Sequence, residues 1–280
     1  MTPRPSTASV SDFGLPLRAS HRSMGDESRY LRATVGWTLL LYAALALAVA
    51  EVLAAGWLLA VVPLVYVRLA LAMHELLHLR AGARVPAFHR LAMIFDTPFG
   101  LGLREHRAIH LRHHRHSAGA HDPELFQLRG GHLHAFAAAL LVPELSLWHW
   151  LRRHGLSTAL AREALLRSVC FAAIAALNPL AFLVYWLALR LSIGASGFVF
   201  HHLLHQRDGR LGTFALPGTP MLFKLGRLLF GDEAMLILQR HRAHHLWPQL
   251  RVRELPDLPP ELALPPGALD DARRSAAALR

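Results

Sequence analysis

Cysteine is almost absent from this chain of 280 residues, which contains only Cys170. One cysteine cannot form an intrachain disulfide, and cysteine-based zinc or iron–sulfur sites are excluded as well. Because Cys170 lies within an apolar run, we interpret it as a packing residue. The sequence also lacks an internal repeat, a heptad pattern and the alternation of apolar and polar residues that half-buried strands show. The expected fold is therefore all-α.

The two ends of the chain have the composition of tails. Residues 1–32 are rich in Ser, Pro and Arg and contain no apolar core like that of a signal peptide. We predict that they form a disordered basic tail. Residues 256–280 are predicted to form a second, Pro-rich tail, so that one domain covers residues 33–255.

Charge and composition together indicate an integral membrane protein. Hydrophobic residues make up 53% of the chain, yet its formal net charge is +11. A multi-pass membrane protein combines these features, because apolar spans are joined by basic loops. A basic, soluble nucleic-acid-binding protein would not need long apolar runs, so no nucleic-acid partner is expected.

Two long apolar stretches predict about four transmembrane helices in two hairpins. A span needs about 20 apolar residues, so residues 33–79 fit one hairpin with its turn at residues 54–56. Residues 165–204 fit a second hairpin, whose turn lies either at residues 178–179 or nearer Arg190. Burial of Arg190 in a span would cost about 2.5–3.5 kcal/mol unless it is paired. Arg190 is therefore expected to face protein or the membrane interface.

Shorter apolar segments are predicted to lie at the membrane interface. Residues 132–151 are interrupted by polar residues, and an extra crossing there would separate the histidines described below across the membrane. Residues 88–103 are interpreted as interfacial or re-entrant. Arginine is frequent in the N-terminal tail and after Leu79 but absent from the turn of the first hairpin. The positive-inside rule therefore places both termini and the histidines in the cytoplasm, and a bacterial cytoplasmic membrane is the expected location.

The 20 histidines are the most unusual part of the composition, and most of them fall into four clusters. The candidate metal ligands are His74, His78, His110, His113, His114, His201, His205, His241, His244 and His245. On a helix, residues at i, i+3 and i+4 share one face, so the members of a cluster can point together. Neutral imidazole suits iron, zinc, copper or nickel. Ten converging side chains exceed what one ion can use, which predicts two metal ions close together.

These clusters resemble the histidine boxes of the membrane fatty-acid desaturase and hydroxylase superfamily. Its three boxes have the patterns H-x(3–4)-H, H-x(2–3)-H-H and H/Q-x(2–3)-H-H. They are matched in order by His74/His78, His110/His113/His114 and His241/His244/His245. As is common in that family, Asp122-Pro123-Glu124 follows the second box and Leu246-Trp247-Pro248 the third. His205, with His201 one turn earlier, resembles a further ligand after the last span, and the resemblance covers residues 35–260.

The resemblance implies four spans under a cytoplasmic helical cap, two iron ions, O2 and an external electron donor of the ferredoxin or cytochrome type. It implies oxidation of an unactivated C–H bond in a lipid-like substrate, with desaturation of a fatty acyl chain as the main expectation. Hydroxylation or ketone formation on an alkane, carotenoid or sterol is the alternative within the superfamily. Glu75, Asp122 and Glu124 would either orient ligand imidazoles or be solvated charges.

Two other functions are compatible with parts of the pattern. Residues 74–78 also match H-E-x-x-H, the motif of zinc metalloproteases, but a protease leaves the other three clusters unexplained. A histidine-rich metal transporter or sensor would need polar groups within its spans, whereas these spans are nearly bare of them. The sequence therefore favours a membrane di-iron oxidoreductase.

Overall fold

The computed structural model describes residues 24–78, 100–259 and 264–266. Residues 1–23 of the predicted N-terminal tail, most of the predicted interfacial segment 88–103 and most of the C-terminal tail lie outside the described residues. The chain divides into two compact units. We call Met24–His110 with Gly130–Phe198 the span unit, and Leu111–Arg129 with Val199–Arg280 the histidine unit.

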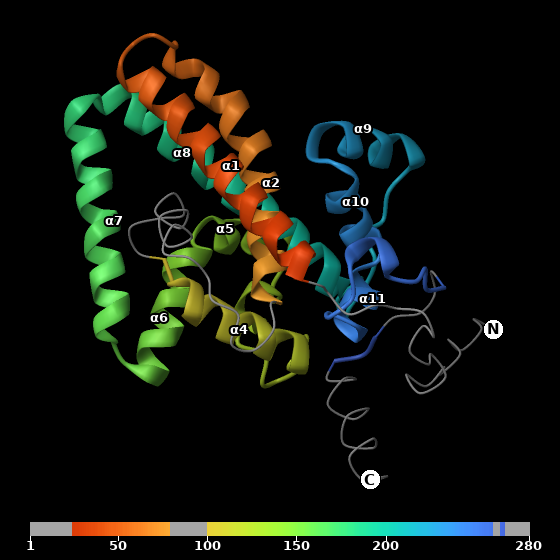
Figure 1. The fold of residues 1–280 in the computed structure, drawn as a ribbon. Coiled ribbons are helices and arrows are strands. Elements are labelled where there is room, and N and C mark those ends of the chain that lie inside the picture. The colour runs from red at the N-terminus through yellow and green to blue at the C-terminus, as the bar shows by residue number, and fades with distance from the viewer. Residues whose placement is uncertain (1–23, 79–99, 260–263, 267–280) are drawn as a thin grey trace. The chain divides into compact units, whose positions relative to one another are not determined.

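The span unit is built from helices (Figure 1). They are α1 (Met24–Val49), α2 (Leu58–Leu77), the first part of α4 (Leu103–His116), α5 (His132–Leu140), α6 (Val142–His154), α7 (Thr158–Leu177) and α8 (Pro179–Gly197). Helices α1 and α2 form the predicted first hairpin, whose turn contains the 3-10 helix η2 (Ala55–Trp57). Helix α8 packs against both, and leucine, valine and alanine side chains of the three helices make the core with Phe171 of α7.

The turn of the second hairpin lies at Asn178 and Pro179, which decides between the two predicted positions. The Asn178 side chain accepts a hydrogen bond from the Ala181 amide and so caps α8. Pro179 occupies the first turn, where a missing N–H leaves no helical bond unmade. Nδ2 of Asn178 also donates to the Val49 carbonyl at the end of α1, 3.3 Å away. The tips of the two hairpins therefore lie together at one end of the span unit.

Within the described residues, three helical segments are long and apolar enough to cross a membrane: Ser28–Val49, Ala55–Leu77 and Pro179–Leu203. The fourth predicted span corresponds to α7, which has 20 residues. It contains Arg162, Glu163 and Arg167 and is less apolar than the other three. Its buried Arg167 donates hydrogen bonds to the carbonyls of residues 100 and 101. This pairing gives the guanidinium polar partners inside the unit.

Arg190 on α8 faces protein, as predicted. It donates to both carboxylate oxygens of Glu144 on α6 and to the Leu140 carbonyl. Its guanidinium carbon also lies 4.3 Å from the centroid of the Trp186 ring. The charge of Arg190 is thus paired with Glu144 and stacked on Trp186. This pairing lowers the free-energy cost of a charged side chain in an apolar helix.

Residues 132–151 form two short helices, α5 and α6, with a break at Leu141. Neither helix is long enough to cross a membrane, which agrees with the prediction that this segment is not a span. Helix α5 packs against the end of α8 that contains Gly194. A Cβ atom at this position would lie 2.5 Å from Cδ2 of Leu140, so glycine permits the close approach of the two helices.

The histidine unit consists of short elements. After the end of α4 come the 3-10 helix η4 (Leu125–Gln127), most of the π-helix η5 (Phe198–Leu203), the strands β1 (Gln206–Arg207) and β2 (Arg210–Leu211), the helices α9 (Pro220–Phe230), α10 (Asp232–Gln239) and α11 (His241–Leu246), and the 3-10 helix η6 (Val252–Glu254). The two strands pair as a small antiparallel hairpin, the one departure from an all-helical fold among the named elements. A small core forms around α11 from Ala243, Trp247, Leu250 and Leu255.

Ordered structure extends into both predicted tails. Helix α1 begins at Met24, inside the segment predicted as the N-terminal tail. At the other end, Arg240 bonds to Asp257 at 2.7 Å, and buried Arg242 donates to the carbonyls of residues 258 and 259. Local composition could not reveal these contacts, because both arginines come from outside the Pro-rich segment.

Candidate metal centre

Helix α4 carries three of the predicted ligands on one face. His110, His113 and His114 stand at positions i, i+3 and i+4, and all three are buried. The chain passes from the span unit to the histidine unit after His110. The predicted ligands are therefore described as two groups, one in each unit.

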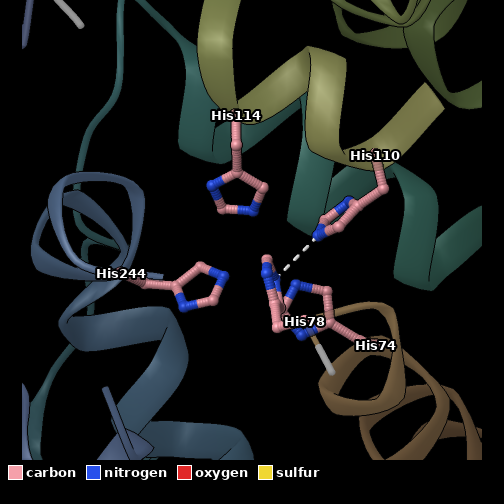
Figure 2. A group of neighbouring side chains, drawn as sticks. All are labelled: His74, His78, His110, His114 and His244. Atoms are coloured by element: carbon pink, nitrogen blue, oxygen red, sulfur yellow. Dashed lines mark hydrogen bonds between the residues drawn. The ribbon is translucent and has the colours of Figure 1, made fainter. Parts of the chain in front are cut away.

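Three histidines meet in the span unit (Figure 2). His74 lies in the last turn of α2, His78 follows the end of that helix, and His110 comes from α4. Their ring centroids are 4.7 to 5.0 Å apart, and each offers a nitrogen within 4.8 Å of the others. Nε2 of His78 and Nε2 of His110 are 3.0 Å apart. Two nitrogens bound at a right angle about 2.1 Å from one ion lie about 3 Å apart, so this spacing suits a shared metal.

Two polar side chains hold this group in place. Oε1 of the fully buried Glu75 lies 3.1 Å from Nδ1 of His74. A carboxylate on Nδ1 orients the ring and leaves Nε2 for a metal ion. Arg107 on α4 donates to the Leu77 carbonyl at 3.1 Å and so ties α4 to the end of α2. Burial of Glu75 excludes the alternative that it is a solvated charge.

The other seven predicted ligands lie in the histidine unit. They are His113 and His114 on α4, His201 in η5, His205 just after η5, and His241, His244 and His245 on α11. His114 and His244 point toward each other, with ring centroids 4.7 Å apart (Figure 2). Two sets in this unit bring one ligand atom per residue within 4.8 Å: His113 with His205 and His245, and His113 with Glu124 and His201.

Asp122 determines the orientation of His113. Its Oδ2 atom lies 2.9 Å from Nδ1 of His113, and its two oxygens also accept the amides of Ala118 and Glu124. Burial opposes ionisation of Asp122, but His113 and these amides lower the pKa of the carboxyl below its usual value. Burial would likewise lower the pKa of His113, but the two acidic side chains raise it to about 9. With Nδ1 bound to Asp122, Nε2 is the nitrogen that a metal can reach.

Glu124 is a buried carboxyl group beside two histidines. Its Oε2 atom lies 3.4 Å from Nδ1 of His113 and 3.6 Å from Nδ1 of His201. Burial raises the pKa of Glu124 to about 7, although His113 acts in the opposite direction. The sequence predicts that Glu124 either orients a ligand or is a solvated charge. It does not predict that Glu124 joins His113 and His201 in a set that could hold a metal ion. The Asp-Pro-Glu element after the second box is the signal that points to it.

The backbone holds His205 in one tautomer. Nδ1 of His205 lies 3.1 Å from the Gly212 carbonyl, and because a carbonyl only accepts, Nδ1 carries the hydrogen. Nε2 then keeps its lone pair, and it lies 3.0 Å from Nε2 of His241. Burial, together with neighbouring histidines, lowers the pKa of His205 well below its usual value. The ring is therefore neutral, which is the form that binds a metal.

His245 is almost completely buried. It is 1% exposed, and neither ring nitrogen has a hydrogen-bond partner among the described residues. Burial, followed by the charges of nearby histidines, lowers the pKa of His245 well below its usual value. Its ring centroid lies 4.2 Å from that of His114 and 5.0 Å from that of His205. An unsatisfied buried polar group costs about 1–3 kcal/mol, and metal coordination would offset that cost.

Three comparisons with known proteins were informative to different degrees. No curated protein sequence and no solved structure matches the chain significantly. The sequence model of the fatty acid desaturase family matches residues 51–267, which is more than half of the chain and includes all ten predicted ligands. The chain therefore belongs to the fatty acid desaturase family, a family of membrane di-iron oxidoreductases.

Proposed function

We propose that this protein is a multi-pass membrane enzyme that uses two iron ions and O2 to oxidise an unactivated C–H bond of a lipid-like substrate. Desaturation of a fatty acyl chain is the proposed reaction. The observation that carries the proposal is the gathering of buried and half-buried histidines in each unit of a chain that belongs to the desaturase family. Family membership supports iron as the metal and a lipid as the substrate.

The ten predicted histidines are the proposed iron ligands. Three of them lie in the span unit and seven in the histidine unit. Their donor atoms suit iron, since imidazole nitrogen is an accepted ligand for it. The buried and unsatisfied His245 and the neutral His205 support the same assignment. Bound iron would supply the activation of O2 that removal of hydrogen from an alkyl chain requires.

The chain's own side chains prepare the ligands for this chemistry. Glu75 holds His74, Asp122 holds His113 and the Gly212 carbonyl holds His205, each through Nδ1. Pre-oriented rings bind an ion without losing rotational freedom at that moment. Burial keeps bulk water away from a strongly oxidising site.

Electrons for the reaction must come from a separate protein. Forming a double bond with O2 reduces the oxygen to water, and this takes two electrons beyond those of the substrate. The chain has one cysteine and no dinucleotide fingerprint, so it carries no obvious redox cofactor of its own. A ferredoxin- or cytochrome-type donor is proposed, and the net charge of +11 would suit an acidic one.

In the membrane, α7 is proposed as the fourth span. Its 20 residues extend about 30 Å, which equals the thickness of the hydrocarbon core. The hydrogen bond between Asn178 and Val49 supports this, because it holds the tips of both hairpins at one end of the span unit. The histidines and both termini are proposed to face the cytoplasm of a bacterium, as the distribution of arginine favours.

Metal analysis of the purified protein tests the centre. We expect about two iron ions per chain, with iron lost on His113→Ala and on His244→Ala. The control is His149→Ala on α6, which lies outside the four clusters and should keep both ions. A single zinc ion that is lost with His74→Ala but unaffected by His244→Ala would overturn the di-iron proposal and favour the H-E-x-x-H metalloprotease.

Product analysis tests the reaction. The protein in lipid nanodiscs would receive a ferredoxin, its reductase, labelled O2 and phospholipids with deuterated saturated acyl chains. Desaturation removes two deuterium atoms and leaves no label from O2 in the chain. A product that carries one labelled oxygen atom would mean that the reaction is hydroxylation and not desaturation. Iron-loaded protein that consumes no O2 with acyl lipids, alkanes or carotenoids would contradict the proposed substrate class.

A further inference from the structure

Helix α9 (Pro220–Phe230) of the histidine unit carries exposed apolar side chains along one face. The exposed side chains of this face are Met221, Leu222, Leu225 and Leu228. Their spacing of one, four and seven residues from the first places them on one side of a helix. Met221 and Leu228 are 73% and 76% exposed, which is unusual for large apolar side chains arranged in one stripe.

The side of α9 that contains Gly226 is anchored to protein. Thr219 caps the helix through its hydroxyl, which accepts the Leu222 amide, and Gly226 faces α10. A Cβ atom at Gly226 would lie 2.3 Å from Sδ of Met235, so the two helices are in close contact there. The apolar side chains are therefore exposed on a helix that is packed against α10, and their exposure does not come from a detached helix.

The charges of α9 lie along the flank of the stripe. Lys224 and Arg227 are both exposed, one helical turn apart, and the helix contains no acidic residue. On a helical wheel both residues lie on the flank of the stripe away from Gly226, with Lys224 next to Leu228 and Arg227 farther round the helix. Basic side chains on the flank of an apolar stripe are the pattern of helices that lie in the surface of an anionic bilayer.

From these features we propose that α9 lies in the interfacial layer of the membrane, with its leucine stripe among the acyl chains and its two basic residues at anionic headgroups. A bilayer is favoured over a second copy of the chain for two reasons. The same chain contains three helices long and apolar enough to cross a membrane, so the whole protein is proposed to reside in a bilayer. The stripe is also entirely aliphatic and lacks the Tyr and Trp residues that dominate protein–protein hot spots. This inference goes beyond the proposed function and does not depend on the metal.

Spin labels on the full chain in nanodiscs of phosphatidylcholine and phosphatidylglycerol test the proposal. In a Cys170→Ala background, labels would be attached at Leu225→Cys and Leu228→Cys, with Lys224→Cys and Arg227→Cys as matched controls on the same helix. Collision rates with O2, which concentrates in lipid, and with a water-soluble nickel chelate would be compared. We expect O2 collisions to dominate at the two leucine positions and nickel collisions to dominate at the two basic positions.

Two results would overturn the proposal. One is dominant nickel collision at all four positions, which would mean that the stripe faces water. The other is protection from both reagents at Leu225 and Leu228 with dipolar broadening between labels, which would mean that a second copy covers it. If the Cys170→Ala background does not fold, a photo-reactive benzoylphenylalanine at Leu228 replaces the labels. Lipid adducts then support the proposal, and protein dimers or the absence of lipid adducts contradict it.

A change of lipid tests the part of the proposal that concerns charge. Discs of phosphatidylcholine alone, or the double variant Lys224→Gln/Arg227→Gln, should shift the labels at Leu225 and Leu228 toward water. No shift in either case would refute the role of the two basic residues. Because the readout is contact with lipid, a failure here leaves iron content and turnover untouched, and a failure of the di-iron proposal leaves this measurement unchanged.

Discussion

The carboxylate of Asp122 decides which nitrogen of His113 a metal can reach, because it lies 2.9 Å from Nδ1. In Asp122→Asn, the amide can still accept a hydrogen bond but no longer supplies the negative charge that strengthens a metal-bound imidazole. We expect the affinity for ferrous iron to fall about 10- to 100-fold. Equilibrium titration of the iron-free protein measures this change.

The matched control for this variant is Asp257→Asn in the same unit. Asp257 pairs with Arg240 near the surface, and its side chain is 81% exposed. Its replacement should leave iron affinity unchanged. Equal affinities in Asp122→Asn and the unaltered protein would show that Asp122 does not prepare His113 for metal.

His245 supports a second prediction at the residue scale, since both of its ring nitrogens are buried without a hydrogen-bond partner among the described residues. Phenylalanine has a similar shape and no polar atom to satisfy. In the iron-free state, His245→Phe should therefore be as stable as the unaltered protein or more stable, by about 1–3 kcal/mol. At the same time it should bind less iron. Thermal unfolding in detergent and metal analysis measure the two effects.

A core variant serves as the comparison for His245→Phe. Leu250→Ala, which opens a cavity in the same unit, should lose about 2–5 kcal/mol in the iron-free state. Loss of stability on the same scale in His245→Phe would mean that His245 is a packing residue and would contradict its role as a ligand.

At the scale of elements, the contact between α5 and α8 depends on the absence of a side chain at Gly194. A valine there would meet Leu140, whose Cδ2 and Cγ atoms lie 2.5 and 3.1 Å from the position of a Cβ atom. We expect Gly194→Val to lose about 1–3 kcal/mol of stability through overpacking. Thermal unfolding in detergent measures this loss.

Gly36→Val on α1 is the control, because nothing lies within 4 Å of a Cβ atom at that position. Both variants replace glycine by valine within a helix, so the change in helix propensity is the same. The difference between their unfolding temperatures therefore reports the α5–α8 contact alone. Equal unfolding temperatures would mean that the two helices can separate without cost.

Helix boundaries can be predicted from sequence where neighbouring residues form a recognisable cap or break. Asn178 and Pro179 form a cap followed by a first-turn proline, and the structure selects this one of the two turn positions that the sequence left open. The break at Leu141 between α5 and α6 was not predicted, because the residues around it have no strong helix-breaking signal before Pro143. The membrane character of α7 also stays a prediction, since its three charged residues make its composition ambiguous.

At the scale of the whole molecule, the topology predicts which residues are reached from outside the cell. In a Cys170→Ala background, Val52→Cys and Leu177→Cys lie at the tips of the two hairpins and are exposed. A membrane-impermeant maleimide should label both in intact cells. Leu156→Cys, exposed at the other end of α7, should react only after the membrane is permeabilised.

Leu156→Cys is the decisive position in this experiment. Equal labelling of Leu156→Cys and Leu177→Cys in intact cells would mean that α7 does not cross the membrane, and the number of spans would then be three. Labelling of Leu177→Cys without Val52→Cys would contradict the hydrogen bond that joins the two tips.

Sequence alone determined the family of the chain and predicted the histidines that are proposed to carry its chemistry. Histidines at i, i+3 and i+4 share a helix face wherever the helix lies, and an apolar run of about 20 residues predicts a span without further context. Only the tertiary structure decided which side chains and carbonyls orient the proposed ligands. Ser117 and Gly212 reach His205 from 88 and 7 residues away, and Glu144 reaches Arg190 from 46 residues away. Burial, tautomer and charge pairing depend on such distant partners, and local sequence patterns carry no information about them.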